Sequence, residues 1–524
     1  MSAGLDSATA PRDGTAPHSV TTLHSDVEEL LDALAADRGR EALLHRDRRI
    51  TAGELVDSVH RLAHALDGRV EPGRVVALLA GNTPEAVVAR CAVTLLGAGI
   101  TQPHEGLSAA AQARIVDDVE APLVLADADA ASAAEPVLAL VPGVDVLWLG
   151  PHGADTDVTA EAATASTAPV RGRARPDAIE QIRHTGGTTG HPKGITYTFD
   201  HHRRGAELRR RGGFGGGDAG SRLLVATPVA HVGGSLADRT LTGGGTVVLQ
   251  DRFEPGAFLA ALERERITHT FLLPPLIYRL LDHPDIDRTD TSSLRSLVYG
   301  GAPAAPRRIA QAVERFGPVL AQFYGQTEAG GISALSPEEH TRPELLETVG
   351  RPIPTTGISI RDADGAPVAP GGRGELWVRT GMEMDGYWKQ PELTAATVVD
   401  GWVRTGDVAR QDADGYLHLL DRVKDMIVVV GGHVYTSELE DLLMEHPAVR
   451  HAAVFGVPDD DGTETVHAAV VADFPAPSAD ELTGLVADRA GDMYVPRSIE
   501  FVGRIPLTGI GKTDKKALRA ELTG

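Results

Sequence analysis

The stretch from His184 to Gly194 contains the residue types that hold a polyphosphate. Its eleven residues, HTGGTTGHPKG, include four glycines, three threonines and one lysine. Glycines allow the backbone to turn sharply and to approach a ligand, and successive backbone N–H groups form a concave site for anions. The pattern is not a Walker A loop, because Pro192 precedes Lys193 and a glycine follows it. On its own, the stretch fits either a phosphate loop or a flexible Gly/Thr turn.

Lysine is rare in this chain. Only six of the 50 Lys and Arg residues are lysines. Because arginine supplies most of the positive charge, a retained lysine is a candidate for a task that needs a compact charge on a flexible stem. Lys193 lies in the glycine-rich stretch, and Lys512 lies in a second Gly/Thr turn, LTGIGKT. Three others are interpreted as solvated surface charges: Lys389, Lys515 and Lys516.

The composition describes a globular chain of two or three domains. It has 524 residues, of which 42% are hydrophobic and 23% are charged. The formal net charge of −23 argues against non-specific nucleic-acid binding, which needs a basic surface. The single cysteine, Cys91, excludes an internal disulfide and is expected in the core. We find neither an apolar run of membrane-spanning length nor a signal peptide, and therefore expect a cytoplasmic enzyme.

Hydrophobic periodicity predicts an α/β chain with largely parallel sheets, after a disordered tail at residues 1–22. A helix is expected from about residue 25, and a second from Thr51, where TAGE fits a capping box. Residues 151–180 are expected to form a loop-rich linker. The expected strands lie at residues 75–80, 123–126, 144–148, 223–226, 246–249, 270–273 and 297–299.

The pattern changes at about residue 349, where glycine-containing turns begin to separate short strands, as in antiparallel hairpins. These turns lie at residues 364–365, 371–372, 400–401 and 414–415. We therefore expect a large N-terminal domain of mixed and parallel sheets with a β-rich subdomain at residues 23–422. A small, mobile α+β domain is expected at residues 423–524. The run RRRGGFGGG at residues 209–217 is predicted to be a mobile surface loop.

Five motifs, read in order, resemble those of the adenylate-forming (AMP-binding) superfamily, which includes acyl- and aryl-CoA ligases, peptide-synthetase adenylation domains and luciferases. They are the glycine-rich stretch, YGQTE at 324–328, TGD at 405–407, DRVKD at 421–425 and the Lys512 turn. The resemblance covers roughly residues 25–524, and the five motifs together are much more specific than any one of them. It implies two steps: a carboxylate attacks the α-phosphate of ATP, releasing pyrophosphate, and the resulting adenylate yields its acyl group to a second nucleophile.

The resemblance implies that the phosphates and Mg²⁺ are bound by two of these motifs. The glycine-rich loop would hold the β- and γ-phosphates, Thr327 would contact the α-phosphate, and Glu328 would bind Mg²⁺. Preorganised donors and cations suit this chemistry because charge develops on phosphate oxygens. From the residues alone, Glu328 could instead be a carboxylate in the first turn of a helix. The loop residues implied in ATP binding are Thr185, Gly186, Gly187, Thr188, Thr189, Gly190 and Lys193.

The nucleoside is implied to lie between two other segments. Tyr324, followed by Gly325, would stack on adenine, and Asp407 would accept the ribose hydroxyls with help from Arg422. As alternatives, Tyr324 could be a core residue and Asp407 a turn residue. The loop implied to lie beside the adenine contains Gly301, Ala302 and Pro303.

The remaining implied roles concern the acid and the movement between steps. Lys512 would bridge the ribose ring oxygen and the reacting carboxylate in the first step and must leave for the second, so Lys424 matches the expected hinge. An exposed linker lysine is the alternative for Lys424. His231 matches a pocket position that closes the acid site or opens the thiol tunnel, although a satisfied core histidine fits as well. The adjacent His201 and His202 lack metal-ligand spacing and receive no role.

The sequence departs from the family pattern at Arg183-His184, at Asp421 in place of the usual glycine, and after Tyr435, where the common proline is missing. The missing proline falls in the segment that, in the family, faces the second substrate, so this change bears on which acceptor the enzyme uses.

We expect an ATP-dependent acid–CoA ligase that uses ATP, Mg²⁺ and CoA on an aryl or acyl carboxylic acid. The alternative keeps adenylation but changes the acceptor, as in an amide synthetase or another adenylate-consuming enzyme of secondary metabolism, such as a diazotase. A third hypothesis is an inactive nucleotide-binding or scaffold protein, against which the retained Lys193, Glu328, Asp407 and Lys512 argue.

Overall fold

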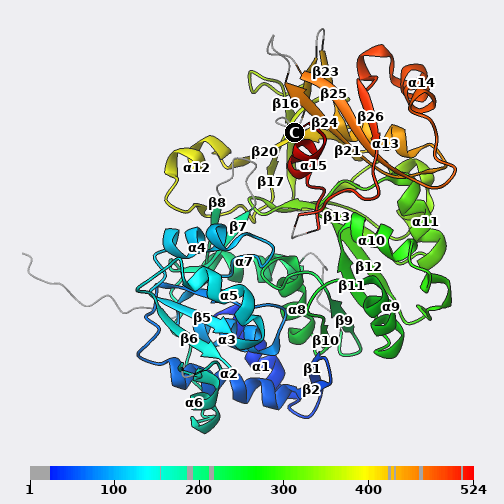
Figure 1. The fold of residues 1–524 in the computed structure, drawn as a ribbon. Coiled ribbons are helices and arrows are strands. Elements are labelled where there is room, and N and C mark those ends of the chain that lie inside the picture. Colours follow the sequence, from blue (N-terminus) through cyan, green and yellow to red (C-terminus); the bar gives the residue numbers. More distant parts are fainter. Residues whose placement is uncertain are drawn as a thin grey trace, which may run out of the picture.

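The computed structural model describes residues 24–153, 155–185, 193–211, 218–422, 426–429, 432–458, 464–508 and 511–523. It shows two large sheets covered by helices, a β-rich layer and a small C-terminal domain (Figure 1). The tail expected at residues 1–22 lies outside these ranges. No helix within them combines the length and the apolar character needed to cross a membrane.

The seven-stranded sheet has the order β18-β8-β7-β4-β3-β5-β6. Its first strand in the chain, VVALL, is buried at every residue, as a continuous apolar run in a parallel sheet should be. Helices α3 (Pro84–Leu95), α4 (Ala109–Asp118) and α5 (Ala131–Leu138) connect the strands, and Cys91 of α3 is buried as expected. The strands are β3 (Val75–Leu79), β4 (Gly99–Thr101), β5 (Leu123–Asp127), β6 (Asp145–Leu149), β7 (Ile179–Thr185), β8 (Lys193–Thr198) and β18 (Gly386–Tyr387).

The nine-stranded sheet has the order β15-β14-β13-β12-β11-β9-β10-β1-β2, and the neighbours from β13 to β1 are parallel. Because the carboxyl ends of parallel strands meet at one edge, the segments that follow β9, β12 and β13 gather there. Its strands are β1 (Glu41–His45), β2 (Arg48–Thr51), β9 (Arg222–Val225), β10 (Thr246–Leu249), β11 (His269–Leu272), β12 (Ser296–Gly300), β13 (Leu320–Gln326), β14 (Gly330–Leu335) and β15 (Arg351–Pro352). Its helices are α8 (Val232–Thr242), α9 (Pro255–Arg264), α10 (Pro274–Leu281) and α11 (Pro306–Phe316).

The N-terminal helices confirm the sequence signals. Helix α1 (Asp26–Ala36) begins near residue 25, and α2 (Ala52–Leu66) begins after Thr51 with both halves of the capping box formed. Two expectations were wrong in part. The linker expected at residues 151–180 contains α6 (Val158–Thr164). The arginines of the 209–217 run form the end of helix α7 (Phe199–Arg211), and arginine is a good helix former. Residues 212–217 lie outside the described part.

The β-rich layer contains five antiparallel strands and α12 (Pro391–Thr397). The turns at 400–401 and 414–415 join neighbouring strands, as predicted. The turns at 364–365 and 371–372 do not separate successive strands. Both lie in the single connection from β16 to β17, which forms its own bridge between Arg361 and Pro367. The strands are β16 (Gly357–Arg361), β17 (Gly374–Arg379), β19 (Val398–Val399), β20 (Trp402–Gln411) and β21 (Leu417–Arg422).

The C-terminal domain, orange to red in Figure 1, lies against the β-rich layer and against α10 and α11. Its apolar core is continuous with that of the nine-stranded sheet: Leu276 of α10 and Val454 of β24 belong to one buried cluster. Burial of this apolar surface stabilises the docked arrangement. The elements are β22 (Ile427–Val429), β23 (Gly432–Val434), α13 (Thr436–Met444), β24 (Val449–Pro458), β25 (Glu464–Ala472), α14 (Ala479–Ala490), β26 (Ser498–Phe501) and α15 (Lys515–Thr523).

Candidate active site

The Asp407 carboxylate is the centre of a buried hydrogen-bonded cluster. Strands β20 and β21 pair so that Asp407 lies opposite Arg422, whose Nε is 2.9 Å from Asp407 Oδ1. From β13, the Tyr324 hydroxyl and the Gln326 Nε2 donate to Asp407 Oδ2 at 2.5 and 2.6 Å. Asp407 is 4% exposed. A carboxylate has about four acceptor positions, so it can accept a further hydroxyl beside these three donors.

Gln326 is a member of this cluster to which the sequence analysis assigned no role. Its Nε2 also donates to the Thr405 carbonyl at 2.8 Å, which ties β13 to β20. It follows Tyr324 by two residues in the same strand, a spacing that places side chains on one face. This two-residue spacing in YGQTE could have identified Gln326 from the sequence.

Glu328 and Lys193 both contact Tyr387. The Tyr387 hydroxyl donates to Glu328 Oε1 at 3.0 Å, and Lys193 Nζ lies 5.4 Å from the centroid of its ring. Tyr387 is brought there by the pairing of β18 with β8, in which it lies opposite Ile195. Burial, followed by the charge of Glu328, raises the pKa of Tyr387, so its hydroxyl remains a donor. No motif identified Tyr387 in advance.

The segments that flank the predicted phosphate loop are the paired strands β7 and β8. Thr185 lies opposite Lys193 in the antiparallel register. The loop is therefore the connection of a hairpin, and its two ends are fixed by backbone hydrogen bonds. The intervening residues 186–192 lie outside the described part, and they include five of the residues implied in ATP binding: Gly186, Gly187, Thr188, Thr189 and Gly190.

The loop after β12 lies next to the YGQTE strand. Gly300 pairs with Phe323, and a Cβ atom at Gly300 would lie 2.1 Å from the Phe323 carbonyl oxygen. Gly301 has a φ of +80°, which turns the chain out of the strand. Ala302 packs partly against the core, and Pro303 is exposed. A Cβ at Gly325 would lie 2.4 Å from the Gly330 carbonyl oxygen. Both β12, at Gly300, and β13, at Gly325, therefore need glycine near their ends.

The Thr327 backbone is held by another tyrosine of the seven-stranded sheet. Its carbonyl accepts a hydrogen bond from the hydroxyl of Tyr197 on β8. The next residue, Glu328, accepts a backbone hydrogen bond from Met384 N–H at 2.9 Å. The Thr-Glu pair is therefore fixed by its backbone, and its side chains are oriented from a rigid base.

His231 stands at the start of α8 beside a second histidine. Its ring is stacked on that of His104, with centroids 5.8 Å apart. Burial, followed by the nearby charges of Arg183, His104 and Lys512, lowers the pKa of His231 to about 3. The ring is therefore neutral at physiological pH. His104 accepts a hydrogen bond at Nδ1 from Gly106 N–H at 2.8 Å, so its proton lies on Nε2, which has no hydrogen-bond partner among the described residues.

The Lys512 turn reaches across to the N-terminal domain. Thr508 N–H donates to the Lys512 carbonyl at 2.7 Å, which closes the turn, and Gly511 adopts a φ of +82°. A Cβ at Gly511 would lie 3.6 Å from the Leu276 side chain of α10. The charge of Lys512 acts on His231. The turn is therefore docked over the sheet edge that carries His231.

Two charged side chains of the N-terminal domain hold helix α13 in this docked position. Asp421 accepts a hydrogen bond from the backbone N–H of Thr436, where α13 begins without a side-chain cap of its own. Burial raises the pKa of Asp421 to about 6. Arg307 of α11 donates to the four carbonyls of Met444, His446, Pro447 and Val449, at 2.7 to 3.4 Å. The expected hinge, Lys424, lies outside the described residues.

Comparison with known proteins agrees with this geometry. Residues 31–388 match the family model of AMP-binding enzymes, and residues 438–512 match that of the AMP-binding enzyme C-terminal domain. The chain is 36% identical to the medium/long-chain-fatty-acid–CoA ligase FadD8 of Mycobacterium tuberculosis, over 94% of this chain and 89% of that protein. It is 37% identical to a feruloyl-CoA synthase of Amycolatopsis, over 66% and 70%.

The described structure is also similar to a solved one. The amide bond synthetase McbA from Marinactinospora thermotolerans superposes with a TM-score of 0.86 at 41% identity, covering 95% of this chain and 100% of that one. Its name and those of the two sequence relatives specify different acyl acceptors.

Proposed function

This chain belongs to the family of AMP-binding enzymes, and from that premise we propose that it is an acid–CoA ligase that works through an adenylate. A carboxylate oxygen of the acid attacks the α-phosphorus of ATP, and pyrophosphate leaves. The thiol sulfur of CoA then attacks the acyl carbonyl and loses its proton, and AMP leaves. The names of the sequence relatives support CoA as the acceptor.

The nucleotide is proposed to bind between the Asp407 cluster and the paired strands β7 and β8. Asp407 would accept from the ribose hydroxyls at its remaining acceptor position, and Arg422 would hold the carboxylate in place through its ion pair. Tyr324 would lie against the adenine beside the Gly301–Pro303 loop. Lys193 and the loop that begins at Thr185 would hold the β- and γ-phosphates.

The magnesium ion is proposed to bind at Glu328. The donor set fits: Glu328 offers a carboxylate and Thr327 a hydroxyl, and Mg²⁺ prefers such hard oxygen ligands together with substrate phosphates. Bound there, the ion would neutralise charge on the phosphate oxygens. The Tyr387 hydroxyl would orient the carboxylate through its 3.0 Å hydrogen bond.

The position of Lys512 carries the proposal. Its turn is docked on the N-terminal domain, and its charge acts on His231. From there the ammonium would bridge the acid carboxylate and the nucleotide while charge develops during adenylation. Since a thiol must later reach the same carbonyl, the C-terminal domain would turn away about Lys424 for the second step.

A second candidate, amide formation, is favoured by the 41% identity to an amide bond synthetase over nearly the whole chain. It differs only in the acceptor.

The test is AMP release from ATP and Mg²⁺ with a panel of aryl and fatty acids, each with CoA, with an amine or with neither. Acid-dependent AMP that rises with CoA, and a thioester by mass spectrometry, supports the ligase. AMP that rises only with the amine overturns CoA as the acceptor. Absence of AMP with every acid contradicts both.

A further inference from the structure

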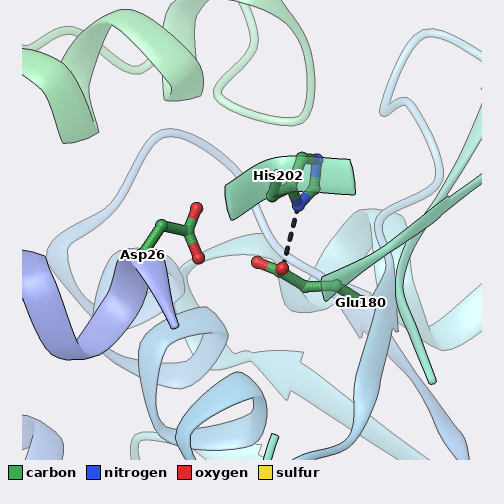
Figure 2. A group of neighbouring side chains, drawn as sticks. All are labelled: Asp26, Glu180 and His202. Atoms are coloured by element: carbon green, nitrogen blue, oxygen red, sulfur yellow. Dashed lines mark ion pairs between the residues drawn. The ribbon is translucent and has the colours of Figure 1, made fainter. Parts of the chain in front are cut away.

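Three side chains from distant parts of the sequence meet outside the site described above. Asp26 of α1, Glu180 of β7 and His202 of α7 face one another in Figure 2. Their ligand-type atoms all lie within 4.8 Å of one another. His202 has no role in the sequence pattern, because it and the adjacent His201 have the wrong spacing for a shared metal. The fold supplies partners that sequence spacing could not show.

Glu180 points into this group from the interior. It is 5% exposed, and its Oε2 has no hydrogen-bond partner among the described residues. The same oxygen lies 3.0 Å from His202 Nδ1, a contact that counts as an ion pair but lacks hydrogen-bond geometry. A buried carboxylate oxygen without a hydrogen bond is costly unless a proton or a cation satisfies it.

The surrounding charges leave an excess of negative charge. Asp238 of α8 forms an ion pair with Arg90 of α3, and both act on Glu180. The group therefore contains three carboxylates, including Asp26, against one guanidinium. The excess is two negative charges when His202 is neutral, and a divalent cation matches it.

We propose that Asp26, Glu180 and His202 bind one zinc ion. An imidazole with two carboxylates suits zinc better than Mg²⁺ or Ca²⁺, which prefer oxygen ligands alone. Ligand atoms at about 2.0–2.2 Å from a tetrahedral zinc lie about 3.3–3.6 Å apart. Glu180 and His202 are already close to that spacing, and a side-chain rotation can bring Asp26 to it. A water molecule would complete the coordination.

The site would join three elements on the way to the phosphate loop. Helices α1 and α7 pack against each other beside β7, whose far end is Thr185, the first residue of the predicted phosphate loop. Zinc would tie both helices to the strand and thereby stiffen one side of the hairpin. The ion is structural in this proposal and takes no part in the chemistry.

Zinc binding by the full-length chain tests the proposal. After treatment with a chelator, the protein is titrated with ZnCl₂ against a chromophoric competitor, and bound metal is counted by elemental analysis. We expect one zinc per chain and a higher melting temperature with zinc. Glu180→Gln and His202→Ala should each weaken zinc binding by about 10- to 100-fold or more. Loss of a group that merely supports a metal ligand already costs that much. The matched control is His201→Ala, whose ring lies 3.9 Å from Asp385 and should leave zinc binding unchanged.

A wild-type readout guards against variants that fail to fold. Cobalt(II) bound to the unaltered chain should give the visible absorption of a four- or five-coordinate site, and zinc should displace it. If the wild-type chain binds no zinc, the proposal is wrong, and protons shared among the side chains neutralise the buried charge instead. Equal zinc affinity in Glu180→Gln and the wild type would also overturn it. None of these readouts depends on AMP release, so the proposed function stands or falls separately.

Discussion

Replacing Arg307 with alanine should slow adenylation and leave the transfer step intact. The guanidinium donates to four carbonyls of the C-terminal domain, but Nη1 shares three of them at 3.0 to 3.4 Å and only Nη2 makes a short bond, at 2.7 Å. Counting these as one to two charge-assisted hydrogen bonds, the docked position should lose about 2–3 kcal/mol. That energy corresponds to a change of about 30- to 150-fold in the docking equilibrium.

The assay compares the two half-reactions. Acid-dependent exchange of pyrophosphate into ATP reports adenylation, and single-turnover consumption of a synthetic acyl adenylate reports transfer. Pyrophosphate exchange should fall by up to about 30- to 150-fold, the change in the docking equilibrium. Consumption of the synthetic adenylate should be unchanged or faster. The control is Arg315→Ala on the same helix, whose guanidinium donates to the Ile286 and Thr289 carbonyls within the N-terminal domain. Equal losses in both half-reactions, or the same ratio in the control, would refute the reasoning.

Three further predictions concern Lys512, Tyr387 and Asp421. Lys512→Ala should lower adenylation on the order of 10² to 10³-fold while a synthetic adenylate is still consumed, since a transition-state contact is lost; equal loss in both steps contradicts this. Tyr387→Phe should raise the Mg²⁺ concentration at half-maximal pyrophosphate exchange by on the order of 10-fold, because Glu328 loses its orienting hydroxyl; an unchanged midpoint contradicts it. The pKa of Asp421 is raised to about 6 in the folded chain, so its contribution to stability is complete below about pH 4 and is lost as pH rises through 6. Asp421→Asn should therefore gain up to about 3 kcal/mol relative to the wild type between pH 4 and 7 in urea unfolding, and parallel pH profiles would disprove the assignment.

Local pattern predicted much of the fold because the relevant physics acts within one element. The buried strand at residues 75–79 follows from five successive apolar residues, and the start of α2 follows from a threonine and a glutamate three residues apart. The arginines at 209–211 were misjudged because the glycine-rich composition of the run was given more weight than the helix propensity of arginine. The two turns in the β16–β17 connection were misjudged because a turn signal does not say which strands it joins.

The candidate site divides in the same way. The sequence by itself identified the candidate chemical residues, Lys193, Glu328, Asp407 and Lys512, because each stands in a motif whose residue types and order are specific. Only the tertiary structure brought Tyr387 to Glu328, through the pairing of β18 with β8.

The docking contacts and the zinc site needed the tertiary structure as well. Arg307 meets carbonyls about 140 residues away, and Asp26 meets His202 from another helix. Such contacts depend on how elements pack and in what register. A sequence records which face of an element is apolar, whereas the packing of those faces decides which polar groups become neighbours.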